Sequence, residues 1–232
     1  MEMIKAYRPE SNSLSSGQVL SRPYAFEEAK VVAREMIDRL VLDMVTKDLV
    51  TDQIVLAVGY DKESLNIPNV NFTDVNFTDV KADANRQNPQ GSHGTQLSKD
   101  YYGQTVPKSA HGSINLGEWT SSSRLIIQKT MELFDRIVGR DLLIRRMYVV
   151  ASRVKLEKEA AMEEQAPEQL DLFEDPEVKE KNQKEKEKEK RRQEAILSIR
   201  ARFGSNAILM GTDFLDGATQ KERNEQIGGH KK

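Results

Sequence analysis

Hydrophobic and polar positions follow two different periods along the chain, and these periods predict six elements. Runs with a period of two, typical of half-buried strands, lie at 13–21, 51–60, 106–116 and 142–154. Apolar residues spaced three or four apart, typical of a helix with one buried face, lie at 26–48 and from about 123 to 138. The order is therefore strand, helix, strand, strand, helix, strand.

This order predicts an α+β fold of the split βαβ or ferredoxin-like type (βαββαβ), with two helices on one face of a four-stranded sheet. The residues expected to face the helices are Ile54, Leu56, Val58, Met147, Val149 and Ala151. The stripe expected on the second helix is Ile127, Met131, Phe134 and Val138, after an N-cap among Thr120 and Ser121–Ser123. The opposite face of the sheet is left open, with Arg146, Tyr148, Val150 and Ser152 pointing outward.

The segments outside these elements define the domain organisation. Residues 1–12 are interpreted as a linker, 13–155 as one domain, 156–192 as a charged linker and 193–232 as a short helical C-terminal segment. Within the domain, Arg22-Pro23-Tyr24 is expected to form a turn. The polar stretch 61–105, with its tandem Val-Asn-Phe-Thr-Asp copies at 70–79, is expected to be an expanded, mobile loop.

Composition narrows the class of protein. The chain of 232 residues has a net charge of −2 and no cysteine, so a binding surface for nucleic acid must be a local gathering of donors. Its three histidines lie far apart, which argues against a metal site. We expect no membrane span and no secretory signal, and hence a soluble, cytoplasmic protein.

The polar positions of the open face suggest a ligand. Small hydroxyl side chains, with a glycine that lets another backbone approach closely, suit a phosphate backbone without requiring a base sequence. The first strand carries such residues at 13–17, and the third carries them at 109–113. The alternative is a serine-rich edge strand without a ligand, and Arg145 and Arg146 can equally serve to solvate an exposed sheet.

Four stretches resemble the C-terminal part of bacterial Y-family translesion DNA polymerases of the UmuC-like type. They are NSLSSGQVLSRPY at 12–24, VPKSAHGSINLG at 106–117, LLIRRMYVVASRV at 142–154 and ERNEQIGGHK at 222–231. In that family this region is the little finger, a βαββαβ domain whose open sheet grips the phosphates of primer and template. The resemblance covers most of the chain, apart from the loop and the charged linker.

The resemblance implies a set of DNA contacts on the open sheet. The residues it places there are Ser13, Ser15, Ser16, Gly17, Arg22, Lys108, Ser109, His111, Gly112, Ser113, Arg145 and Arg146. His111 is expected to be a phosphate or structural donor, since no carboxylate is spaced to orient it as an acid–base catalyst. The expected role is to bind double-stranded primer–template DNA during DNA repair and damage tolerance, as in the SOS response, in the nucleoid.

The resemblance also implies that polymerisation is catalysed by a different domain of the family, the palm. In the family, palm carboxylates hold the two Mg²⁺ ions, and the palm precedes the region that this chain resembles. We therefore expect no catalytic residue, no metal and no cofactor here, and no enzyme activity of this chain alone. A separate polymerase catalytic fragment is then one expected partner.

A second expected partner is the sliding clamp. Residues Gln169, Leu170, Asp171, Leu172 and Phe173 match the Q-L-x-L-F type of clamp-binding peptide. In such short motifs two large apolar side chains fill a cleft while the glutamine bonds at its rim. The alternative is that these side chains pack back on the domain or on the helix expected at 193–203.

Two other function classes stay open at this stage. The first is a ferredoxin-like RNA-binding module, which reads single strands by stacking bases on aromatic side chains of the sheet. The open face offers few aromatic residues beyond Tyr148, which argues against it. The second is a structural interaction protein in which the Lys/Glu run serves as a helical spacer.

Overall fold

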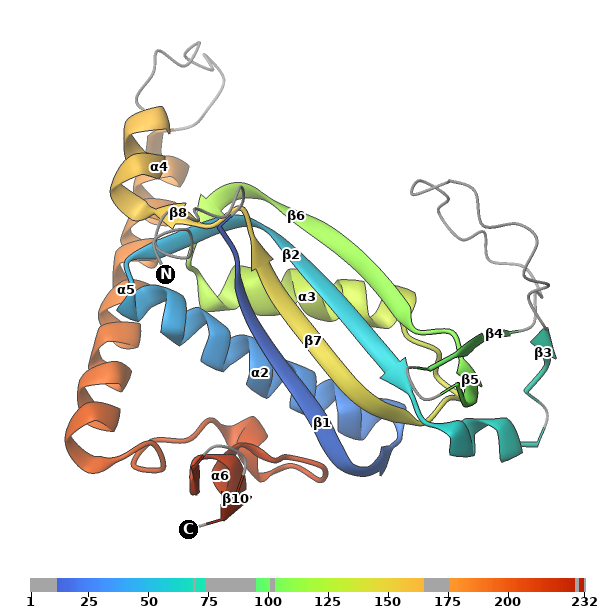
Figure 1. Cartoon of the computed structure of the whole chain (residues 1–232). Helices are drawn as coiled ribbons and strands as arrows, with labels where there is room; N and C mark the ends of the chain where they lie inside the picture. Colours follow the sequence, from blue (N-terminus) through green and yellow to red (C-terminus); the bar gives the residue numbers. More distant parts are fainter. Residues whose placement is uncertain are drawn as a thin grey trace, which may run out of the picture.

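A computed structural model describes residues 12–68, 70–73, 95–100, 103–164, 176–227 and 230–231. The main sheet contains β1 (Leu14–Tyr24), β2 (Leu49–Tyr60), β6 (Ala110–Thr120) and β7 (Ile144–Ser152), in the spatial order β1-β7-β2-β6. The short β8 (Lys155–Leu156) adds to β2, and all these pairings are antiparallel. Helices α2 (Phe26–Thr46) and α3 (Ser123–Ile137) both cover one face (Figure 1). The predicted α+β arrangement is confirmed.

The core lies between this face and the two helices. The residues predicted to point inward from β2 and β7 are fully buried, as is the apolar line of α2. On α3 the predicted stripe is confirmed at Phe134 and Val138, which are buried, whereas Ile127 and Met131 are half-buried and Ile126 and Leu133 are buried in their place. The N-cap of α3 is Ser122, whose hydroxyl accepts a hydrogen bond from the Leu125 N–H, as expected for a serine in this position.

The first strand is longer than the pattern predicted. Residues 22–24 do not form a turn, because β1 continues through Pro23 and Tyr24 pairs with Ile144. A proline is tolerated here because β1 lies at the edge of the sheet that the described residues form, with β7 as its neighbour, so the missing N–H need not have a ladder partner. The chain then enters α2 directly.

The stretch expected to be a loop has folded ends. It contains the 3₁₀ helix η1 (Lys62–Asn66) and a small sheet of β3 (Phe72–Thr73), β4 (Thr95–Lys99) and β5 (Thr105–Pro107). Val70 and Phe72, from the first copy of the tandem repeat, pack against the core. These two half-buried side chains attach the described part of this copy to the domain, and the second copy lies outside the described residues.

The charged C-terminal region forms α4 (Glu157–Glu164) and α5 (Pro176–Phe203). Helix α5 runs without a break across the boundary expected at 192/193, and it is attached to the domain. Gln193 is buried, and its side-chain amide donates to the Ser121 carbonyl (2.9 Å) and the Ser123 hydroxyl (2.8 Å). The carboxylate of Glu189 accepts from the Arg124 N–H at 2.9 Å, at the first turn of α3.

The remaining segment folds back on α2 and β1 through η2 (Gly211–Phe214) and α6 (Gln220–Arg223) (Figure 1). It ends in the small hairpin of β9 (Gln226–Ile227) and β10 (His230–Lys231). Arg223 donates to the Gln18 side chain on β1 at 2.7 Å, which fixes this segment beside the edge strand. No described helix is long and apolar enough to cross a membrane.

Candidate nucleic-acid interface

Helices α2 and α3 lie on one side of the main sheet (Figure 1), and the opposite face carries several of the residues predicted to bind a ligand. The antiparallel registers align its side chains in rows that run across the strands. From β1 to β6, one row is Ser15, Val150, Val55 and Ser113, and the next is Gly17, Tyr148, Ala57 and His111. A third row contains Val19, Arg146 and Gly59.

Polar and apolar residues are separated on this face. The edge strands β1 and β6 present exposed short polar side chains, including Ser15, His111 and Ser113. The central strands β7 and β2 present Val150, Val55 and Ala57 between them, all half-buried. The predicted outward positions of Tyr148 and Val150 are confirmed, and two large side chains are well exposed on this face: Val19 at 66% and Tyr148 at 46%.

Two glycines on this face lie beneath large side chains. A Cβ atom added to Gly17 would fall 2.8 Å from the ring of Tyr148, its partner on β7. A Cβ added to Gly59 would fall 2.6 Å from both Cγ and Nε of Arg146, again its direct cross-strand partner. Each large side chain thus lies flat across the neighbouring strand, in the space that the missing Cβ leaves free.

The basic residues predicted to contact DNA are not equivalent. Arg22 forms an ion pair with Glu28 on α2, and Arg145 lies 3.6 Å from Asp61. Lys108 donates to the Gln96 side chain of β4 at 2.9 Å. Among the described residues Arg146 has no carboxylate partner. The register of β7 shifts between Ile144 and Arg146, which marks a β-bulge. Because of this bulge, the neighbouring Arg145 and Arg146 have different surroundings.

Two of the predicted contact residues lie on the wrong side of the sheet. Ser16 pairs with the buried Val149, so it points toward the helices. Gly112 also faces them, since a Cβ there would fall 3.1 Å from Leu133 of α3. Ser13 and Ser109 are exposed just before β1 and β6. Each lies two residues before an open-face residue, Ser15 or His111, so alternation places both on the open face.

Residues that the prediction missed complete the face. The Gln53 amide donates to the Asn115 side chain at 3.0 Å, which adds a polar pair next to the serine row. Arg153 reaches the same Asn115 oxygen at 3.3 Å and also pairs with Asp52 at 2.9 Å. Strand alternation along 53–59 was the signal for Gln53 and Gly59, because it places both on the side opposite Ile54 and Val58.

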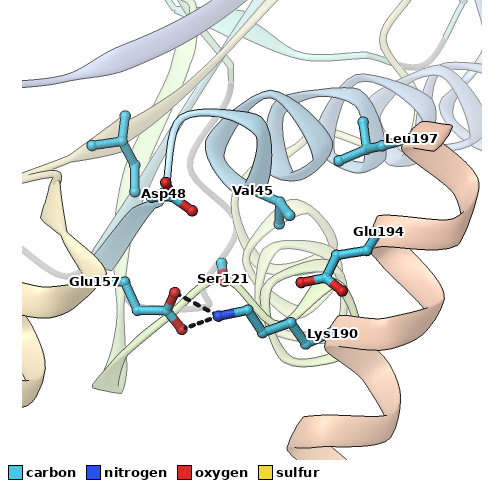
Figure 2. Close-up of a pocket in the computed structure, with 8 residues that line it drawn as sticks. Val45, Asp48, Ser121, Glu157, Lys190, Glu194 and Leu197 are labelled. Carbon is cyan, nitrogen blue, oxygen red and sulfur yellow. Dashed lines mark hydrogen bonds and ion pairs between the residues drawn. The ribbon is translucent and has the colours of Figure 1, made fainter. Parts of the chain in front are cut away.

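Helix α5 borders two concave features: a wide groove of about 1020 Å³ along α3, lined mostly by polar and charged side chains, and a smaller cleft. The cleft, of about 160 Å³, lies between the end of α2, α4 and α5, and Figure 2 shows Lys190 reaching across it to Glu157. The ammonium lies 2.7 Å and 2.9 Å from the two carboxylate oxygens, and this hydrogen bonding raises the pKa of Lys190. Small-molecule sites are typically about 300–1,000 Å³, so the cleft does not compete with the open face as the functional site.

The five residues of the predicted clamp-binding peptide, 169–173, lie outside the described residues. The structure describes the chain on either side, up to α4 and from α5 onward. The assignment of this peptide therefore stays a prediction.

Comparison with known proteins identifies the family. The family model described as the impB/mucB/samB family C-terminal domain matches residues 11–172, which is more than half of the chain. A search of curated proteins gave no match. The matched range contains β1, α2, β2, β6, α3 and β7, that is, the whole sheet and both helices beneath it. The chain thus belongs to the impB/mucB/samB family, and residues 11–172 are its C-terminal domain, the little finger of UmuC-like Y-family DNA polymerases.

Proposed function

We propose that the open face of the main sheet binds the phosphate backbones of duplex primer–template DNA, as part of translesion synthesis in DNA repair. The observation that carries this proposal is the arrangement of the face. Exposed hydroxyl and imidazole groups line its two edge strands, and Arg146 lies on the central strand β7 without a carboxylate partner among the described residues.

The dimensions of the sheet suit a duplex. Neighbouring strands lie about 4.8 Å apart, so the two edge strands of a four-stranded sheet are separated by roughly 14 Å. The major groove of B-DNA is about 12 Å wide. Donors on β1 and β6 can thus reach the two DNA backbones that border the groove. The short apolar side chains of Val55, Val150 and Ala57 lie between these two edge strands.

The same arrangement predicts weak binding without sequence preference. Serine and arginine contacts to phosphate carry no base information, and Val55, Val150 and Ala57 in the middle of the face offer methyl groups that cannot read base edges by hydrogen bonds. The net charge of −2 leaves no general attraction to DNA. Affinity must then come from a few local phosphate contacts, and it must fall as the salt concentration rises.

We also propose three finer points that rest on the family resemblance. The peptide at 169–173 docks on the sliding clamp, which holds the weak DNA-binding face near a primer terminus. The chain alone extends no primer, because the metal-binding carboxylates of the family lie in its palm domain. Its place of action is the cytoplasm, at the nucleoid, where primer–template DNA and the clamp are found.

Direct titration tests the proposal. Fluorescently labelled primer–template duplex, single-stranded DNA and single-stranded RNA are each titrated with the chain at several salt concentrations. We expect the duplex to bind best, with a negative slope of log K against log salt that corresponds to a few phosphates. Preferential binding of single-stranded RNA would favour a module that stacks bases on Tyr148, and no binding of any nucleic acid would favour a structural role.

A parallel assay tests the enzymatic point. The purified chain is incubated with primer–template, nucleotides and Mg²⁺ or Mn²⁺. We expect no extension, and extension that persists through further purification would contradict this part of the proposal.

A further inference from the structure

Gly59 on β2 has no side chain, and this absence determines where the side chain of Arg146 on β7 can lie. Its Cα pairs directly with that of Arg146, and the aliphatic stem and Nε of Arg146 occupy the space where a Cβ would be. Gly59 itself is buried although it belongs to the open face. The arginine side chain therefore covers the glycine.

We propose that Gly59 is a positioning residue for DNA binding: it holds Arg146 flat on the sheet, so that this arginine, and not Arg145, is the principal cationic contact to a phosphate. The inference rests on the proposed function and goes beyond it in separating the roles of these residues. An arginine that is already fixed loses less conformational entropy when it binds than one that must be ordered by the ligand.

The environment of the two arginines supports the division. Arg145 lies 3.6 Å from Asp61, whose other oxygen accepts the Glu63 N–H at the start of η1. A phosphate would have to compete with that carboxylate for the guanidinium. Arg146 has no such competitor among the described residues, and β-bulges commonly serve to redirect one side chain relative to the next.

A single methyl group can test this arrangement. Gly59 has no positive φ, so alanine fits its backbone, and the substitution alone does not strain the strand. The new Cβ would lie 2.6 Å from Arg146 Cγ and Nε, which is too close for any real contact, so the flexible arginine side chain must leave. In G59A the positive charge of Arg146 is retained, but its guanidinium no longer lies in the wild-type position.

Two further glycines provide matched controls. In G211A the added Cβ meets nothing within 4 Å, so this variant reports the effect of a glycine-to-alanine change alone. In G17A the Cβ would press on the uncharged ring of Tyr148, which reports a disturbance of the same face without displacing a charge.

The experiment combines DNA titrations with thermal unfolding for the wild type, R146A, G59A, the double variant, R145A, G17A and G211A. We expect R146A and G59A each to weaken duplex binding about five-fold at low salt and to reduce the salt slope by about 0.9, the value for one phosphate contact. The double variant should bind no more weakly than R146A. G211A should keep the wild-type affinity and slope, R145A and G17A should each reduce the slope less than R146A does, and unfolding temperatures should differ little between wild type and G59A.

A readout that needs no DNA accompanies the titrations. The ¹⁵N relaxation of the Arg146 Nε–H group, assigned by its loss in R146A, should report a rigid side chain in the wild type and a mobile one in G59A. Wild-type affinity and slope in G59A, additive losses in the double variant, or an equally mobile Arg146 in both proteins would overturn the inference. A wild-type chain that binds no duplex would overturn the proposed function, and this inference with it.

Discussion

The carboxylate of Glu35 on α2 holds Thr219, which lies near the far end of the chain. Glu35 Oε2 lies 2.9 Å from the backbone nitrogen and 3.0 Å from the hydroxyl of Thr219. Its other oxygen accepts the Gln220 N–H at 3.1 Å, and the Glu35 side chain is almost fully buried. These bonds attach the C-terminal segment to the domain that the family model matches, although that segment lies beyond the matched residues.

Replacing Glu35 with alanine should therefore destabilise the fold. The two backbone N–H groups would lose their acceptor in a buried position, and each such loss costs about 1–3 kcal/mol. Urea unfolding should show a lower free energy of unfolding, and hydrogen exchange should speed up at Thr219 and Gln220. The E35Q variant is the control, since a glutamine oxygen can still accept both N–H groups; equal stability of E35A and wild type would contradict the role of this contact.

The same residue predicts a pH dependence. Burial raises the pKa of Glu35, against the opposing effect of the hydrogen bonds from Thr219 and Gln220. Burial likewise raises the pKa of Asp38, one turn further along α2. A raised pKa means that the folded state binds the proton more tightly, so this contribution to stability is complete below the unfolded pKa of about 4.3 and is lost as the pH rises through the folded pKa.

The glutamine of E35Q does not titrate, so its contribution to stability does not depend on pH. We expect the stability of E35Q, measured relative to wild type by urea unfolding, to increase steadily between pH 4 and pH 7. A difference that does not change over this range would show that Glu35 titrates alike in the folded and unfolded states.

A third prediction concerns the attachment of α5 to α3. Glu189 accepts the Arg124 N–H at 2.9 Å and the Ser122 hydroxyl at 2.6 Å, so its charge lies at the positive end of the α3 dipole. E189A should lower the free energy of unfolding by about 0.5–1 kcal/mol and expose the first-turn amides of α3 to exchange. E187A, on the exposed side of α5, is the control, because the hydrogen bond that Glu187 accepts among the described residues comes from Gln183 of the same helix. Equal effects of the two variants would exclude a specific capping role.

The elements of the sheet could be predicted because alternation and helical spacing depend on local sequence. Ser16 was assigned to the open face only because a whole stretch was carried over from the family. Leu14, Gln18 and Leu20 lie two or four residues from Ser16 in the same strand and point inward, so strict alternation places Ser16 on the inner side as well. The same reasoning applies to Gly112, which alternates with the exposed His111 and Ser113.

The difference between Arg145 and Arg146 could not be predicted. It depends on a bulge that turns both Ile144 and Met147 toward the helices, which strict alternation does not allow. The buried contacts of Glu35 and Gln193 likewise join residues far apart in sequence. Nothing in the local pattern around an isolated polar residue on a helix reveals a partner that arrives from the other end of the chain.

The last prediction concerns the clamp peptide. Leu172 and Phe173 would fill an apolar cleft on the sliding clamp, and such buried anchors carry most of the binding energy of a short motif. Replacing both with alanine should weaken binding to a bacterial sliding clamp by more than about ten-fold, measured by titration of the full chain. M162A is the control, because Met162 on α4 is also a large apolar side chain and is 72% exposed.

A second measurement separates the peptide from the rest of the chain. A synthetic peptide covering residues 166–176 should compete with the wild-type chain for the clamp, and the same peptide with both alanines should not. On a primer–template loaded with the clamp, the wild-type chain should bind more tightly than on naked DNA, since tethering raises the local concentration of the sheet at the duplex. Equal clamp binding by the wild type and by a folded double variant would show that the clamp, if it binds at all, contacts another part of the chain.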